Sequence, residues 1–166
     1  MFIMKNYGYH LKFPNGWIKT LRKELHKSFG VWSGGTAVDG DVNHLPPVDL
    51  DSKIGKIANK FPSKPQGITL WGTIYYTPSY GIVKKKFQLN RGEEEALIYE
   101  FGMYAHETYH AIDQQQAGRL KWFIKYVLKL IRTPNAWNHP MEKPAYAFQN
   151  HLKQLAREAG RVDTEP

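Results

Sequence analysis

The sequence predicts an α+β domain that is mostly helical, with a small antiparallel sheet or hairpin packed beside one long helix. Apolar residues repeat at helical spacing in four segments, near residues 17–29, 93–117, 120–132 and 145–159. Residues 67–76 instead show the two-residue alternation of a strand. The 166 residues, of which 42% are hydrophobic, are expected to form a single domain with a sizeable core.

The first sixty residues predict a helix, a loop and a short second helix. The helix of residues 17–29 carries an apolar stripe and ends at Gly30. Residues 31–50 are rich in Gly, Asp and Pro, which is typical of an irregular loop. Asp51 is a candidate N-cap for a short helix that runs to Phe61.

Two strands are expected next. Residues 67–76 form the first, and residues 77–81 are typical of a turn because they combine Thr, Pro, Ser and Gly. Residues 82–89 would then pair back as the second strand.

The long helix has clear start and stop signals. Asn90 and Glu93 have the spacing of a capping box, and Glu93 begins a run of three glutamates that suits the positive end of a helix dipole. Gly118 is a plausible end. A core-facing stripe follows the spacing 4, 4, 3 and 4, and comprises Leu97, Phe101, Ala105, Thr108 and Ile112.

This helix contains the sequence His-Glu-Thr-Tyr-His at positions 106–110. Residues four apart lie on one helix face, so His106 and His110 can bind the same metal ion. Glu107 projects from a neighbouring direction, where it can act as a general base. The chain has no cysteine, so any metal must be held by histidine and carboxylate side chains.

A third ligand is expected from the region after the helix. Glu142 is our first choice because it opens an apolar, helical segment that should fix its backbone. His139, three residues earlier, is the competing ligand. Most other downstream acidic residues lie close to the C-terminus, where residues 161–166 are expected to be disordered.

Three stretches together resemble a known family: residues 67–76, residues 106–115 and residues 139–146. They are similar to the zincin-like metallopeptidase domains of the gluzincin type, and most of all to small bacterial domains of unknown function with the same H-E-x-x-H motif. The resemblance covers residues 66–152. It departs from the family pattern at Asp113, where relatives have glutamine, and at Pro144, which requires Glu142 to lie at the entry to its helix.

The resemblance implies a zincin-like fold and a zinc-dependent peptidase that acts on a peptide or protein substrate. His106, His110 and Glu142 would bind Zn²⁺, and Glu107 would be the general base. Tyr146, one turn beyond Glu142, is our candidate for stabilising the oxyanion, with His139 as the alternative. Asp113 is a candidate for orienting one of the ligand imidazoles.

The helix of residues 120–132 is strongly amphipathic. One face carries Lys121, Lys125, Lys129 and Arg132, and the other is apolar, with Leu120, Phe123, Ile124, Val127 and Ile131. Such a helix either packs its apolar face on the core or lies on an anionic membrane, and we expect packing on the core. The net charge of +8 suits an anionic partner, but no nucleic-acid-binding motif accompanies it.

Two other functions compete with the peptidase hypothesis. The domain could be a catalytically inactive zincin-like binding module, or a basic protein that binds membrane or nucleic acid. No long apolar run predicts a transmembrane helix or signal peptide. We therefore expect a cytoplasmic protein by default, with export by a non-classical route left open.

Overall fold

The structure is a computed structural model that describes residues 5–30, 45–50, 52–60, 65–133 and 139–160. Several expectations fall outside these residues: most of the 31–50 loop, the cap at Asp51, the end of its helix at Phe61, and the disordered tail 161–166.

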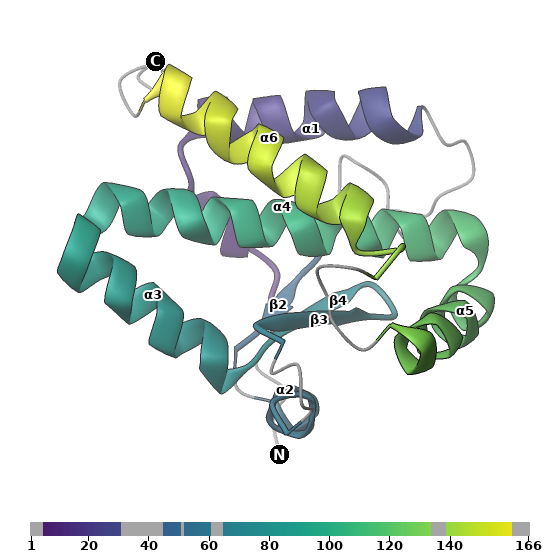
Figure 1. Cartoon of the computed structure of the whole chain (residues 1–166). Coiled ribbons are helices and arrows are strands. Elements are labelled where there is room, and N and C mark those ends of the chain that lie inside the picture. The colour runs from purple at the N-terminus through teal and green to yellow at the C-terminus, as the bar shows by residue number, and fades with distance from the viewer. Residues whose placement is uncertain (1–4, 31–44, 51, 61–64, 134–138, 161–166) are drawn as a thin grey trace.

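The helix α4 (Glu93–Ala117) crosses the middle of the molecule. Helices α1 (Asn15–Phe29) and α6 (Lys143–Ala159) lie on one side of it, and a small sheet lies on the other (Figure 1). Helices α3 (Pro78–Arg91) and α5 (Arg119–Arg132) adjoin its two ends. The mostly helical α+β class predicted from the sequence is therefore confirmed.

In the described part of the chain, the sheet has four short strands in the order β1-β2-β4-β3. Their bounds are Lys5–Asn6 for β1, Val48–Asp49 for β2, Gly67–Leu70 for β3 and Thr73–Tyr76 for β4. The β1–β2 and β3–β4 pairs are antiparallel, but β2 and β4 are parallel. The predicted antiparallel hairpin is therefore present, but the sheet as a whole is mixed. The parallel β2–β4 pair was not predicted, because β2 lies in a segment that carries no strand signal.

The predicted strand of residues 67–76 is in fact a hairpin. Trp71 and Gly72 form its two-residue turn with φ values of 48° and 79°. Two positive φ angles in a row are those of a type I′ turn, which suits the twist of a hairpin. The turn residues were missed because an aromatic residue is an unusual occupant of the first position.

The second predicted strand, residues 82–89, was also wrong, because these residues belong to helix α3. Pro78 stands in the first turn of α3 and Thr77 is its N-cap residue. Tyr80, Val83 and Phe87 follow helical spacing and pack on the core cluster. The helical spacing is hard to recognise in the sequence, because the three lysines at 84–86 interrupt a short apolar run.

Helices α3 and α4 meet at Gly92, whose φ of 90° lets the chain turn sharply. Asn90 lies inside α3, so the predicted capping box with Asn90 as N-cap was wrong. The glutamates Glu93–Glu95 do occupy the first turn of α4, and the helix does end at Gly118.

The other helices lie close to their predicted positions. The helix α1 buries Trp17, Ile18, Leu21 and Leu25 as expected and ends at Gly30. A 3-10 turn, η1 (Tyr9–Lys12), precedes it. The short helix α2 (Lys53–Ala58) is capped by Ser52, whose side chain accepts a hydrogen bond from the Gly55 amide at 3.0 Å.

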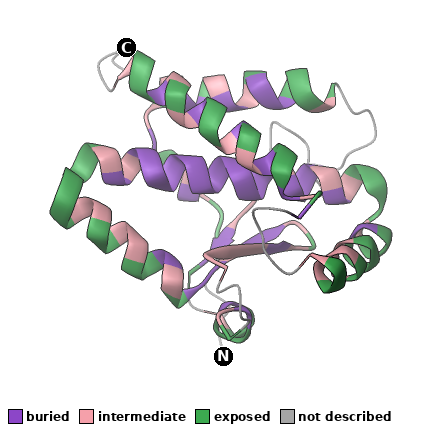
Figure 2. Ribbon diagram, viewed as in Figure 1, coloured by how far each residue is buried: buried purple, intermediate pink, exposed green. Residues whose placement is uncertain are grey.

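The core is organised around α4, whose middle is buried on all sides (Figure 2). Phe101, Ala105 and Thr108 are fully buried, and Ile112 is nearly so, which confirms most of the predicted stripe. The opposite stripe is buried as well, and it includes His106 and His110. The fold therefore places the two histidines inside the protein rather than on its surface.

Candidate metal centre

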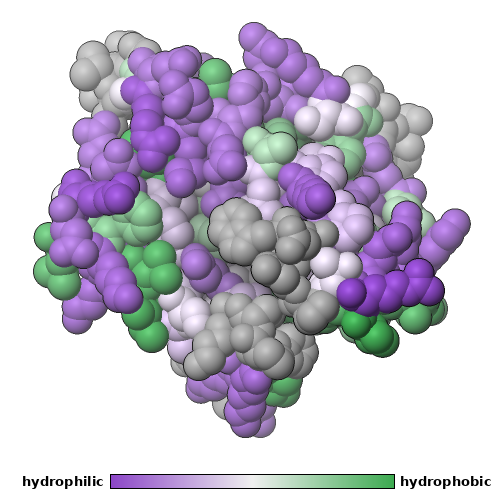
Figure 3. Space-filling model, in the orientation of Figure 1, coloured by the Kyte–Doolittle hydropathy of each residue, from purple (hydrophilic) through white to green (hydrophobic). Residues whose placement is uncertain are grey.

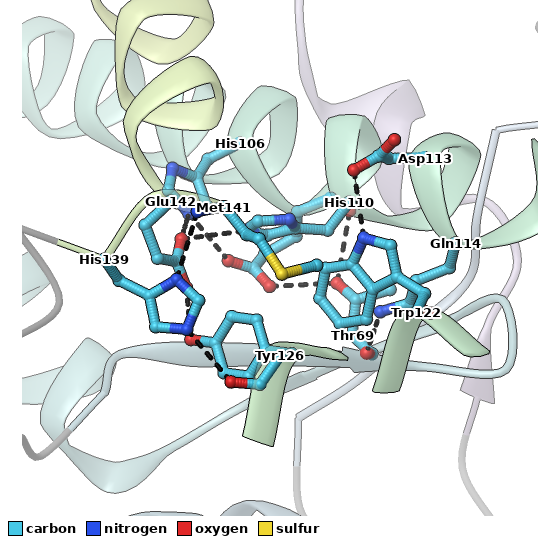
Figure 4. A network of polar contacts seen from close by, with 11 residues as sticks. Thr69, His106, His110, Asp113, Gln114, Trp122, Tyr126, His139, Met141 and Glu142 are labelled. Atoms are coloured by element: carbon cyan, nitrogen blue, oxygen red, sulfur yellow. Dashed lines mark hydrogen bonds and ion pairs between the residues drawn. The ribbon is translucent and has the colours of Figure 1, made fainter. Parts of the chain in front are cut away.

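Three side chains from two helices converge beside α4. His106 and His110 come from consecutive turns of α4, and Glu142 comes from the residue immediately before α6. The Nε2 atoms of His106 and His110 lie 2.9 Å and 2.8 Å from the same oxygen, Oε1 of Glu142 (Figure 4). One ligand atom from each residue lies within 4.8 Å of the others, and all three residues are buried. This group can hold a metal ion.

The loop before α6 fixes Glu142 and its neighbour His139 in different roles. The amides of Glu142 and Lys143 both donate to the carbonyl of His139. Pro144 lies in the first turn of α6, where its missing N–H costs nothing. The Glu142 carboxylate does not cap α6, and it turns toward the imidazoles instead.

His139 is fully buried, and both of its ring nitrogens are engaged. Its Nδ1 accepts a hydrogen bond from the Met141 amide at 3.1 Å, and its Nε2 lies 3.1 Å from the Tyr126 carbonyl. A carbonyl oxygen can only accept, so Nε2 carries the proton and donates. His139 is therefore a structural residue of the loop, and the arrangement favours Glu142 as the third ligand.

The electrostatics of the cluster favour a carboxylate and an imidazolium. Burial alone would make both groups harder to charge. Despite burial, the nearby Glu142 carboxylate raises the pKa of His110 to about 9. In turn, and again against burial, the two imidazoles hold the pKa of the Glu142 carboxyl well below its usual range. These two opposite pKa shifts favour an ion pair between Glu142 and His110 at neutral pH.

Apart from the contacts of their Nε2 atoms with Glu142, the two imidazoles are oriented by aromatic packing. Within the described part of the chain, neither His106 Nδ1 nor His110 Nδ1 has a hydrogen-bond partner. The Trp122 ring packs edge-on against His110 with centroids 5.5 Å apart. The Tyr146 ring lies 4.7 Å from that of His106. Metal-binding histidines usually have a polar partner at the second nitrogen, so this centre depends unusually strongly on packing.

Glu107 lies beside the cluster and is held by the hairpin. Its Oε1 accepts a 2.9 Å hydrogen bond from the Thr69 hydroxyl, while its Oε2 lies 3.6 Å from His106 Nε2. A Cβ added at Gly67 would come within 3.4 Å of the Glu107 side chain, so β3 passes directly against it. One carboxylate oxygen is therefore anchored to β3, and the other faces the ligands.

Two further contacts tie β3 and α5 to the centre, and sequence reasoning missed both. Gln114 donates to the Thr69 carbonyl at 2.6 Å, which fixes β3 to α4. The Tyr126 hydroxyl of α5 donates to Glu142 Oε2 at 2.5 Å. Burial, and then the Glu142 charge, raise the pKa of Tyr126 far above its usual value, so this hydroxyl stays a donor. No local pattern marks Thr69 or Tyr126, since both depend on tertiary packing.

Asp113 does not take the role that the sequence suggested. Its Oδ2 accepts a 2.9 Å hydrogen bond from Trp122 Nε1. Asp113 therefore positions the tryptophan that packs on His110, and its negative charge contributes to the raised pKa of that imidazole.

Tyr146, the candidate for stabilising the oxyanion, lies one turn into α6 with its ring against that of His106. Burial, followed by the Glu142 and Glu107 charges, raises the pKa of Tyr146 to about 12. Its hydroxyl therefore keeps its proton at neutral pH and can donate a hydrogen bond. His139, the alternative considered from the sequence, has no ring nitrogen left to donate.

Comparison of the chain with protein-family models, with curated proteins and with solved structures finds no match in any of the three. The resemblance to zincin-like domains consequently stays a prediction, and the function is argued from the site itself. None of the helices in the described segments is long and apolar enough to cross a membrane.

Proposed function

We propose that this protein is a zinc-dependent hydrolase that cleaves peptide bonds. The observation that carries the proposal is the convergence of the His106 and His110 Nε2 atoms on the Glu142 carboxylate, with the Glu107 carboxylate 3.6 Å from His106. Two histidines and one carboxylate, with a second carboxylate beside them, are the residues that a catalytic zinc site needs.

The donor set fits Zn²⁺. Zinc takes imidazole nitrogen and carboxylate oxygen at about 2.0–2.2 Å, which places two ligand atoms of a tetrahedral site roughly 3.3–3.4 Å apart. The observed distances of 2.9 Å and 2.8 Å are shorter, so the ligands would have to separate slightly to admit an ion. When bound, zinc would supply Lewis acidity toward a water molecule and a scissile carbonyl.

Glu107 would move the proton. Its Oε1 is occupied by the Thr69 hydroxyl, so Oε2 would accept a proton from the attacking water and return it to the leaving amine. Thr69 would keep the carboxylate in one orientation during both transfers. Tyr146 would donate a hydrogen bond to the developing oxyanion, and its raised pKa supports that role.

The sheet supports a peptide as the substrate. In the described sheet, β3 is an edge strand, and it is also the strand that contacts Glu107. An extended peptide can align with such an edge through main-chain hydrogen bonds. A peptide in that position would bring its carbonyl groups close to Glu107 and the ligands.

The first test is the metal content of purified protein by elemental mass spectrometry. We expect about one zinc ion per chain in the wild type, and loss of zinc in His106→Ala, His110→Ala and Glu142→Ala. His151→Ala is the matched control and should keep its zinc, because the His151 side chain is half-exposed and contacts Glu24 of α1 instead of the candidate ligands. Absence of zinc after reconstitution, or zinc retained in Glu142→Ala, would overturn this site.

The second test separates an enzyme from an inactive zincin-like binding module. Glu107→Gln should retain zinc and lose hydrolysis of a quenched fluorescent peptide library by at least about 10²-fold, because the proton acceptor is gone. Glu94→Gln, an exposed residue of the same helix, should remain active. If the zinc-loaded wild type cleaves no peptide, or if Glu107→Gln cleaves as fast as the wild type, this mechanism is wrong.

A further inference from the structure

The outer face of α5 is apolar and largely exposed. Trp122, on the inner side, is the only buried residue of helix α5. Five large apolar residues are instead exposed by 37% to 74%, and they define the outer face: Leu120, Phe123, Ile124, Leu128 and Ile131. The expectation that this helix packs its apolar face on the core was wrong, because its inner side is taken by Trp122 and Tyr126 at the metal centre.

Positive charge borders this face along its whole length. At 100° per residue, the outer face spans an arc of roughly 140°, and Lys121, Lys125 and Arg132 occupy roughly the next 60° on one side of it. The helix has five basic residues and no acidic one. Figure 3 shows hydrophobic and strongly hydrophilic side chains next to one another at the lower right, where α5 lies.

An exposed tryptophan extends the apolar surface onto the sheet. Trp71, at the tip of the β3–β4 hairpin, is 53% exposed, and its ring centroid lies 6.3 Å from that of Phe123. Its φ of 48° is unfavourable for a bulky residue. A glycine or asparagine would relieve that strain, so local stability does not explain a tryptophan here. Tryptophan is the side chain best suited to the boundary between water and lipid.

We propose that the outer face of α5, together with Trp71, docks this protein on an anionic lipid bilayer. The helix would lie in the plane of the membrane, with its apolar side chains below the headgroups and its lysines among them. Charge argues against the other occupants. The cores of protein interfaces are depleted in lysine, and a second copy placed face to face would bring two sets of basic residues together.

The test is flotation of the full-length protein with vesicles. We expect binding to vesicles of phosphatidylcholine with about 30% phosphatidylserine, and little binding to pure phosphatidylcholine. Two variants probe the two halves of the surface. Lys121→Glu/Lys125→Glu should weaken binding at least about tenfold, and Ile124→Ser/Leu128→Ser should do the same at unchanged charge.

Matched variants on α3 provide the controls. Lys85→Glu/Lys86→Glu changes the net charge by the same amount as the α5 charge variant. Ile82→Ser/Leu89→Ser replaces one exposed isoleucine and one exposed leucine, as the α5 apolar variant does. Both should bind like the wild type. Circular dichroism should show that all four proteins are folded, since every changed residue is exposed.

Several results would overturn the proposal. These are no binding to anionic vesicles, an equal loss of binding in the α3 controls, or self-association of the free protein that Ile124→Ser/Leu128→Ser abolishes. Quenching of Trp71 by brominated lipid gives an independent measure of insertion, and Trp71→Phe should reduce it. Glu107 is buried in α4 and is not part of the docking surface, so Glu107→Gln should bind vesicles like the wild type whether or not the proposed hydrolysis is found.

Discussion

Two hydroxyl groups hold the two carboxylates of the candidate metal centre. Tyr126 donates to Glu142, and Thr69 donates to Glu107. Each hydroxyl uses one carboxylate oxygen and leaves the other directed at the imidazoles. The geometry of the centre is therefore set by neutral donors from elements other than those that carry the carboxylates.

Tyr126→Phe should lower the affinity for zinc by about 10–100-fold, the usual effect of losing a polar partner of a ligand. The ring would still stack on Trp122 and His139, so the fold should be kept. Competition with a chromogenic chelator measures the affinity, and Tyr75→Phe in β4 is the control. An unchanged affinity would show that the Tyr126 hydrogen bond does not position Glu142.

At this scale the sequence predicts local geometry well. The four-residue spacing of His106 and His110 already places them on one helix face, and Glu142 was preferred because its segment begins a helix. The roles of Thr69 and Tyr126 could not be predicted, because nothing in their own segments distinguishes them from other polar residues on strands and helices.

Among the elements, helix α2 packs very closely on strand β4, and Gly55 makes this approach of the two backbones possible. A Cβ at Gly55 would lie 2.5 Å from the carbonyl oxygen of Tyr76, which is backbone and cannot move aside alone. By contrast, a Cβ at Gly81 in α3 would meet nothing within 4 Å. Gly55 is therefore required by packing, whereas Gly81 is not.

Gly55→Ala should destabilise the protein by about 1–3 kcal/mol, because α2 must shift away from β4. Gly81→Ala should stabilise it by about 0.5–1 kcal/mol, since alanine favours a helix and has room. Urea unfolding monitored by circular dichroism measures both. Equal effects of the two substitutions would contradict a close α2–β4 contact.

Two element predictions are wrong for different reasons. The turn signal of residues 77–81 favours a second strand at residues 82–89, but Pro78 is also suited to a first helical turn, and the spacing of Tyr80, Val83 and Phe87 indicates a helix. The parallel pairing of β2 with β4 joins segments about 25 residues apart and leaves no mark in either one.

Across the whole molecule, Glu100 of α4 links segments that are distant in sequence. This buried carboxylate binds Lys12 of η1 and, at 3.1 Å, Lys84 of α3, and it accepts a 3.1 Å hydrogen bond from Tyr9. Burial acts to raise the pKa of Glu100, but the two lysines outweigh it and hold the pKa below the usual 4.5.

The stabilisation from Glu100 should therefore be fully present above pH 4.5 and be lost as the pH falls through the lower pKa of the folded state. Glu100→Gln should cost about 1.5–3 kcal/mol at pH 7. The difference in stability between Glu100→Gln and the wild type should become smaller at acid pH. Thermal unfolding between pH 2 and pH 7 measures this, and a difference that stays constant with pH would contradict the charged role of Glu100.

The burial of α4 links the lifetime of the metal centre to that of the fold. We expect small opening motions to begin at exposed elements such as α2 and α3, and to leave the central helix intact. Its buried amides should then exchange with solvent only when most of the structure opens. His106, Glu107 and His110 should thus keep their arrangement through such local openings, and the candidate centre and the fold should be lost in one cooperative transition.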